Sequence, residues 1–146
     1  MNPIYYFDSS ALIKSYLREE GSDFVIKLLS KKTSHFTSSI TYAETYATFF
    51  RLQRQGDLSN HQTEHLSRLF EDDWHQFIII DFSSEIRQYT PALLKKSPLR
   101  GADTVQLVSA FSLLKRGLNP IFVSADKKLL NAAEDCGLKG VNPSDE

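Results

Sequence analysis

IFVSADKKLLNAAED, residues 121–135, is the stretch from which the fold is predicted. Its first three residues are apolar and favour β-structure, so they predict a strand over 121–123. Residues 127–135 then predict a helix, because Leu129 and Ala133 lie one turn apart on a single face. A short apolar strand that leads directly into a helix is typical of a parallel sheet with helices on its faces.

The rest of the chain repeats this alternation. The predicted strands are 4–7, 35–40, 77–80 and 121–123, with a short edge strand over 137–141. The predicted helices are 9–17, 22–31, 41–55, 59–74, 83–94, 100–116 and 127–135. Residues 77–80 are apolar and β-branched, which predicts a strand buried on both faces. We therefore expect an α/β fold of three layers, α/β/α, with a mostly parallel central sheet and a small helical hairpin insertion over 41–74.

Length and composition indicate one ordinary globular unit. The chain has 146 residues, of which 41% are hydrophobic and 24% charged, so we expect a single domain over residues 1–146 and no intrinsic disorder. A net charge of −1 argues against binding nucleic acid by bulk charge alone. Cys136 is the single cysteine, which excludes an intrachain disulfide. No apolar run is long enough for a membrane span and the start lacks a signal-peptide pattern, so we expect a cytoplasmic protein with no membrane partner.

Four acidic residues stand at predicted helix starts, and each has a structural explanation of its own. Asp8 and Asp126 follow predicted strands and have the position of helix N-caps. Glu44 follows Thr41 by three residues, the spacing of a capping box. Asp103 lies in the first turn of a helix, where the helix dipole favours an acid. However, Asp103 also begins the apolar stripe of that helix, and an unpaired carboxylate on a core-facing stripe is costly.

Together the four acids predict a metal site. Three of their helices follow predicted strands, and parallel strands end at the same edge of a sheet, where open α/β sheets bind ligands. Clustered carboxylates repel one another, and divalent cations cancel that repulsion. Oxygen ligands suit one or two Mg²⁺ or Mn²⁺ ions, which promote phosphodiester hydrolysis without a histidine or cysteine nucleophile. Ser124 is placed to donate a hydrogen bond that orients Asp126.

The residues around these acids resemble a known family. The segments are IYYFDSSALIKSYLREEGS around Asp8, TSSITYAETYATFFRL around Glu44, LRGADTVQLVSA around Asp103, and IFVSADKKLLNAAEDCGL around Asp126. In their order and separation they resemble the PIN-domain ribonucleases, specifically the VapC-like toxins of bacterial toxin–antitoxin pairs. The resemblance covers nearly the whole chain.

This resemblance implies endonucleolytic cleavage of RNA that depends on Mg²⁺ or Mn²⁺. It implies that Asp8, Glu44, Asp103 and Asp126 are the catalytic residues and metal ligands, and that Ser10 and Ser124 are supporting hydroxyls. It also implies a homodimer and a small antitoxin that covers the active-site groove. One position departs from the pattern, because Gln106 stands where many relatives have histidine.

Basic and histidine residues offer further candidates. Arg100 and Lys127 lie beside site acids and are our preferred RNA contacts. Lys14, Arg18, Arg51, Arg54 and Lys128 are weaker candidates, since each is also explained as a solvated surface charge. His61, Glu64 and His65 match the H-x-x-E-H zinc-peptidase pattern formally, but the surrounding segment has the polar composition of an exposed helix face.

Other functions remain open at this stage. A housekeeping RNA-processing nuclease of the same fold has the same site residues. A catalytically silent module that binds RNA or protein would differ by lacking metal-dependent cleavage. A signalling receiver domain would need paired acids after the first strand, whereas Asp8 is followed by two serines.

Overall fold

The computed structural model of the protein describes residues 2–146 and contains a five-stranded parallel sheet. The sheet has the order β3-β2-β1-β4-β5, and every neighbouring pair is parallel. The strands are β1 (Tyr5–Phe7), β2 (His35–Ser38), β3 (Ile78–Ile80), β4 (Ile121–Val123) and β5 (Lys139–Val141). The predicted parallel sheet is thus confirmed, including the short edge strand near the carboxyl end.

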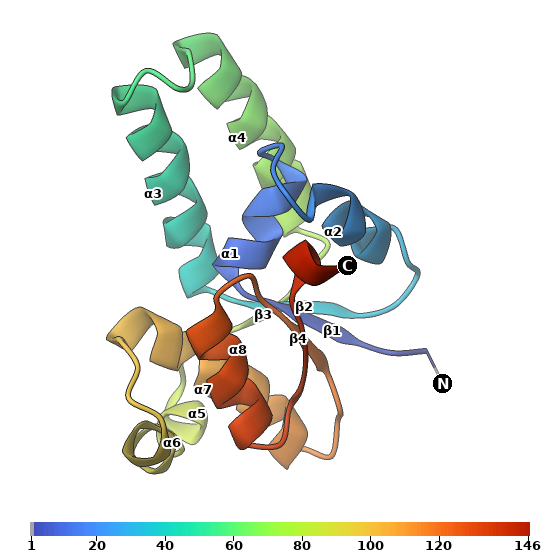
Figure 1. The fold of residues 1–146 in the computed structure, drawn as a ribbon, viewed down its shortest axis with the longest axis vertical. Helices are drawn as coiled ribbons and strands as arrows, with labels where there is room; N and C mark the ends of the chain where they lie inside the picture. The colour runs from blue at the N-terminus through green and yellow to red at the C-terminus, as the bar shows by residue number, and fades with distance from the viewer. Residues whose placement is uncertain (1) are drawn as a thin grey trace.

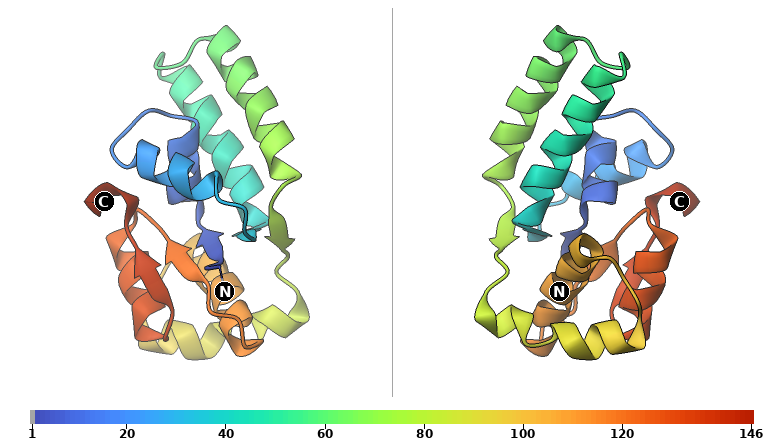
Figure 2. Two further views of the ribbon diagram at one scale, coloured as in Figure 1. Left: turned by 90° about the vertical axis from the view of Figure 1, so that its right-hand side faces the viewer. Right: turned by 90° about the vertical axis from the view of Figure 1, so that its left-hand side faces the viewer.

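Helices cover both faces of this sheet (Figure 1). On one face lie α1 (Ser9–Leu12), α2 (Ser22–Leu29), α3 (Ile40–Arg54) and α4 (Asn60–Trp74), with the 3₁₀ turn η1 (Ile13–Ser15) following α1. On the other lie α5 (Ser84–Arg87), α6 (Thr90–Lys96), α7 (Gly101–Lys115) and α8 (Lys127–Asp135), and the chain ends in the 3₁₀ turn η2 (Pro143–Asp145). The antiparallel pair α3 and α4 extends away from the sheet as the predicted helical hairpin (Figure 2).

Alternation along the strands builds one core on each face. In β1, Tyr6 points into the core beneath α7 and α8, where its ring stacks on Phe122 with centroids 5.4 Å apart. Its neighbours Tyr5 and Phe7 point the opposite way, into the core that α1, α2 and α3 share. All three side chains are buried, as expected for a central strand covered on both faces. This packing fixes the position of the residue that follows β1.

The position of β3 differs from the prediction. Residues 77–80 were expected to be buried on both faces, but β3 is an edge strand and Ile78 is 48% exposed. An apolar, β-branched run predicts that a segment forms a strand. It does not predict whether that strand is central or at the edge, because the crossover connections of the chain set the strand order.

Two predicted helices are interrupted. The helix expected over 83–94 is divided into α5 and α6, because Pro91 in the first turn of α6 has no backbone N–H with which to continue a helix from α5. The helix expected over 9–17 is a four-residue α-helix followed by η1. No helix within residues 2–146 is long and apolar enough to span a membrane.

The order of the strands reverses between β1 and β4, and this reversal predicts a crevice beyond the carboxyl ends of these two strands. The chain runs from β1 outward through β2 to β3, then returns to the other side of β1 and runs outward through β4 to β5. The connections beyond β1 and β4 therefore leave on opposite faces. Ligands bind at such a reversal point, beyond the carboxyl ends of the strands.

Candidate active site at the carboxyl ends of β1 and β4

Asp8 lies directly beyond β1 and is nearly inaccessible. Its backbone N–H donates to the carbonyl oxygen of Val123, which extends the pairing of β1 with β4 by one residue. Its side chain caps α1 by accepting a hydrogen bond of 2.9 Å from the Ala11 N–H, so the expected N-cap is confirmed. The side chain is only 2% exposed. The pKa of Asp8 is raised from 3.8 to about 6, chiefly by burial and in smaller part by the negative charge of Asp126.

Two serine hydroxyls hold the Asp8 carboxylate from either side. Ser10 Oγ donates to Oδ1 at 2.7 Å, and Ser124 Oγ donates to Oδ2 at 2.6 Å. Ser124 also accepts a hydrogen bond from the backbone N–H of Asp126. The prediction that Ser124 orients the Asp126 side chain was therefore wrong, because its hydroxyl proton is directed to the more buried acid. Both hydroxyls oppose the effect of burial by stabilising the ionised form of Asp8.

Glu44 enters the same region from the second turn of α3. The capping box considered for Thr41 and Glu44 is wrong, because α3 begins one residue earlier, at Ile40, and has no side-chain cap. The Glu44 carboxylate instead reaches across to other elements. Its Oε1 accepts hydrogen bonds from Ser9 Oγ at 3.0 Å and from Gln106 Nε2 at 2.9 Å. Glu44 is thereby tied to the residue after Asp8 and to α7.

Asp103 and Asp126 belong to α7 and to the start of α8, on the face of the sheet opposite α1 and α3. With Asp8 and Glu44 they form what we call the acidic region. Asp126 caps α8 by accepting hydrogen bonds from the N–H groups of Lys128 and Leu129, as expected. Asp103 is half-buried in the first turn of α7 and makes no side-chain hydrogen bond with residues 2–146. Burial raises the pKa of Asp103, and the charges of Asp126 and Glu44 raise it further. The four acids thus act on one another across the crevice.

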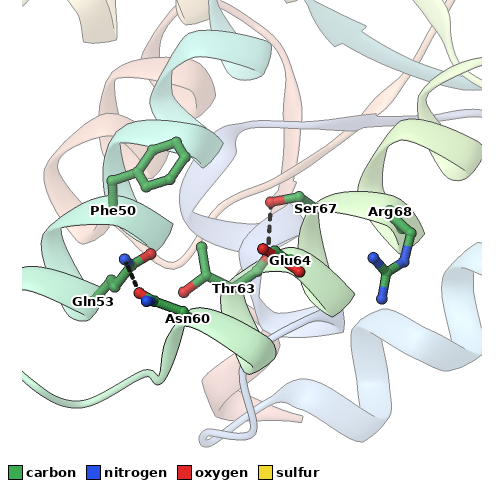
Figure 3. A pocket seen from close by; sticks show the side chains of 7 residues that line it. All are labelled: Phe50, Gln53, Asn60, Thr63, Glu64, Ser67 and Arg68. Carbon is green, nitrogen blue, oxygen red and sulfur yellow. Dashed lines mark hydrogen bonds between the residues drawn. The ribbon is translucent and has the colours of Figure 1, made fainter.

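These acids form no ion pairs with basic side chains of the described residues. None of the ion pairs within residues 2–146 includes Asp8, Glu44, Asp103 or Asp126. No three acidic, histidine or cysteine side chains in the described part of the chain are close enough to hold an ion on their own. The H-x-x-E-H residues therefore form no zinc cluster there. Glu64 instead lines a cavity of about 510 Å³ between α3 and α4, beside Ser67 and Arg68 (Figure 3).

A second cavity lies beside the serines that contact the acids, and two basic residues, Lys14 and Arg51, line it. It has a volume of about 410 Å³ and is bordered by Ser9 and Ser10, which contact Glu44 and Asp8 respectively. Thr48 and Arg51 of α3 also line it. Glu44, Thr48 and Arg51 follow one another at spacings of four and three residues, so they form one stripe along α3, which we call the α3 stripe.

The other cations differ in their surroundings. Arg100 and Lys128 both lower the pKa of Asp103, which places their charges near the acids, whereas Lys127 is exposed in the first turn of α8. Lys14 also borders the second cavity, but it is 7% exposed and its ammonium group is already paired with Glu19 at 3.1 Å. Arg18 is paired with Asp23.

Sequence reasoning missed two contacts of Glu44, Ser9 and Gln106. Ser9 is the first of the two serines that follow Asp8, and only the second was singled out. Gln106 lies on α7 three residues after Asp103 and is 1% exposed. A long polar amide among the core-facing residues of a helix was the signal that could have indicated a partner across the core.

Comparison with known proteins identifies the family. Residues 5–135 match the model of the PIN domain. This chain belongs to the PIN domain family. It is 28% identical over 137 residues to ribonuclease VapC45 of Mycobacterium tuberculosis, and the match covers 94% of each chain.

Several solved structures share the fold of this chain. VapBC2 of Rickettsia felis, bound to a DNA fragment of its promoter, gives a TM-score of 0.66 at 19% identity, covering 95% of this chain and 98% of that one. A toxin–antitoxin complex of Klebsiella pneumoniae gives a TM-score of 0.62 at 18% identity, covering 95% and 97%. At sequence identities of 18–19%, this similarity supports a shared fold only.

Proposed function

We propose that this PIN domain protein is a metal-dependent endoribonuclease and the toxin of a toxin–antitoxin pair. One observation carries the proposal: four carboxylates, which follow β1 and β4 or lie on α3 and α7, act on one another at the reversal point of the sheet, and none of them forms an ion pair within residues 2–146. The similarity to ribonuclease VapC45 over 94% of both chains supports RNA as the substrate. The toxin–antitoxin complexes among the structural neighbours support a small antitoxin as protein partner.

The residues fit Mg²⁺ or Mn²⁺. Asp8, Glu44, Asp103 and Asp126 offer oxygen donors only, as these cations prefer. Burial raises the pKa of Asp8, and no ion pair within residues 2–146 includes its carboxylate. Mg²⁺ usually keeps several waters and takes further oxygens from a phosphate, so the protein need not enclose it.

In the proposed reaction the protein positions the RNA and supplies fixed charges. Ser10 and Ser124 hold Asp8 in one orientation, while Ser9 and Gln106 hold Glu44. The cavity beside Ser9 and Ser10 receives the neighbouring nucleotide, and Arg51 contacts its phosphate. A bound Mg²⁺ or Mn²⁺ supplies the positive charge that draws in the scissile phosphate and offsets charge developed during its displacement.

The proposal is tested by mapping new RNA 5′ ends. Wild-type protein incubated with total cellular RNA and Mn²⁺ is expected to produce discrete internal ends, and EDTA is expected to abolish them until Mn²⁺ is restored. Asp103→Asn is expected to produce none, because it removes a proposed metal ligand that makes no hydrogen bond within residues 2–146. Cleavage by wild type that persists in EDTA, or absence of new ends with either Mg²⁺ or Mn²⁺, would contradict the proposal.

A growth experiment separates the toxin from a housekeeping nuclease. Expression of the toxin is expected to arrest growth, and Asp103→Asn is expected to relieve the arrest. Normal growth of cells that contain active wild-type enzyme would instead favour a housekeeping RNA-processing nuclease. Light scattering decides whether the protein forms the homodimer that the resemblance implies.

Arg51→Ala is expected to weaken RNA binding roughly fivefold, about 1 kcal/mol, through loss of one phosphate contact. The slope of log affinity against log salt should become shallower by about 0.7, the value for one phosphate on single-stranded nucleic acid. Arg54→Ala is the matched control, because Arg54 is an exposed arginine of the same helix that does not line the cavity. Equal effects of the two variants would show that only general surface charge is involved.

A further inference from the structure

Gln106 is a buried amide whose hydrogen bonds join three elements of the fold. It lies in α7, is 1% exposed, and contacts Tyr6 of β1 and both Thr41 and Glu44 of α3. The polar atoms of the amide are all used, with Nε2 at 2.9 Å from each of its two acceptors and Oε1 at 2.6 Å from the Tyr6 hydroxyl. A buried amide with complete partners is held in one orientation.

The chemistry of the partners fixes which end of the amide faces Glu44. An ionised carboxylate only accepts hydrogen bonds, so the atom of Gln106 beside Glu44 must be the Nε2 donor. The tyrosine hydroxyl then donates to Oε1 on the other side. A flipped amide would place two acceptors against each other at Glu44. Glu44 therefore selects the orientation of the amide, and Tyr6 stabilises that orientation by donating to Oε1.

Both hydrogen bonds to Glu44 converge on a single oxygen. Ser9 Oγ and Gln106 Nε2 donate to Oε1, and no donor within residues 2–146 contacts Oε2. The two donors approach from different elements, so the carboxylate can neither rotate nor withdraw without losing one of them. The second oxygen thus makes no hydrogen bond within residues 2–146 and is left for another partner.

We infer that Gln106 is a positioning residue that fixes Glu44 with Oε2 free to act as the metal-ligand oxygen. This inference rests on the proposed function, in which Glu44 is a metal ligand. Removing a residue that hydrogen-bonds to a metal ligand and orients it typically lowers metal affinity or activity 10–100-fold. Gln106 is buried behind Glu44 and lines neither cavity bordered by α3, so it has no part in RNA binding.

The variants separate positioning from general stability. Gln106→Leu removes every hydrogen bond of the amide while keeping a similar volume. Gln106→His is the conservative variant, because a neutral imidazole still offers one donor for Glu44 and one acceptor for Tyr6. Ser112→Ala is the matched control, since Ser112 is buried in the same helix and bonds only to the Ser109 carbonyl oxygen.

Mn²⁺ affinity and kinetics give the first measurement. Gln106→Leu is expected to bind Mn²⁺ about 10–100-fold more weakly in a titration without RNA, and to lower kcat with KM for RNA unchanged. Gln106→His should recover most of the affinity, and Ser112→Ala should match wild type. Wild-type affinity in Gln106→Leu, or an equal loss in Ser112→Ala, would overturn the inference.

NMR of the metal-free protein gives a measurement that does not depend on nuclease activity. The two Nε2 protons of Gln106 are expected to resonate separately and exchange slowly, and Glu44→Ala should remove the protection of one of them. Unprotected protons in the wild type would overturn the positioning role even if RNA cleavage is confirmed. Protected protons in a protein that neither binds Mn²⁺ nor cuts RNA would show that Gln106 holds Glu44 while the proposed function fails.

Discussion

Asp8→Asn is expected to abolish RNA cleavage and, at neutral pH, to stabilise the metal-free protein. The loss of activity should be on the order of 10²–10³-fold or more, because a charge held ready for the transition state is removed. The gain in stability follows from burial, which raises the pKa of Asp8 to about 6 and so makes the ionised form unfavourable at pH 7. A neutral amide of the same shape relieves that cost, although Ser124 then needs another acceptor. We expect a gain of about 1–3 kcal/mol in the free energy of unfolding.

The pH dependence of this gain has a defined sign. The pKa of Asp8 is higher in the folded than in the unfolded protein, so protonation stabilises the fold, and this stabilisation is lost as pH rises through about 6. Metal-free wild type should therefore approach the stability of Asp8→Asn as the pH is lowered from 7 toward 4. Thermal melts of both proteins in EDTA across that range measure the difference directly.

Asp81→Asn is the matched control for these melts. Asp81 also follows a strand directly, but it lies beyond the edge strand β3 and is exposed. Its replacement should change neither cleavage nor the pH dependence of stability. If Asp8→Asn were instead clearly less stable than wild type at pH 7, the hydrogen bonds that the carboxylate accepts from Ser10 and Ser124 would outweigh the cost of the buried charge, and Asp8 would be explained as a structural residue.

Phe122→Ala is expected to have the largest effect on stability, a loss of about 3–5 kcal/mol. Phe122 is fully buried in β4, and its ring stacks on Tyr6 in the core beneath α7 and α8. Truncation leaves a cavity between the sheet and these helices that close packing cannot fill. Urea unfolding, followed by far-UV circular dichroism, gives the change in the free energy of unfolding.

Ile78→Ala provides the contrast, because it tests the place of β3 in the sheet. Ile78 belongs to the most apolar strand of the sequence but is 48% exposed at the edge, so its truncation should cost less than about 1 kcal/mol. A loss as large as that of Phe122→Ala would mean that β3 is buried on both faces, as the sequence pattern predicted.

The sequence was most informative where local chemistry determines structure. The strand over 121–123, the helix over 127–135 and the caps by Asp8 and Asp126 were all predicted, because hydrophobic periodicity and capping act within a few residues. The family resemblance rested on the same local segments, and the match over residues 5–135 confirms it.

Features set by distant contacts were harder to predict. The strand at 77–80 was placed wrongly, since its neighbours in the sheet depend on the path of the whole chain. Glu44 matched a capping box in spacing, yet its true partners are 35 and 62 residues away in sequence. The roles of Asp8, Glu44, Asp103 and Asp126 as metal ligands stay a proposal, because periodicity shows that they share an edge but not how their oxygens are directed.

The α3 stripe fixes the distance between Glu44 and Arg51, because both residues lie on one continuous helix. Glu44 and Arg51 are seven residues apart, which corresponds to two turns and about 10 Å along the axis. Adding or deleting one residue between them would swing Arg51 about 100° around the helix and out of the cavity, although every side chain would still be present. If the proposed function is right, the distance between the cleaved bond and the phosphate that Arg51 contacts is set by the pitch of this one helix, and insertions or deletions along α3 are as damaging as substitutions.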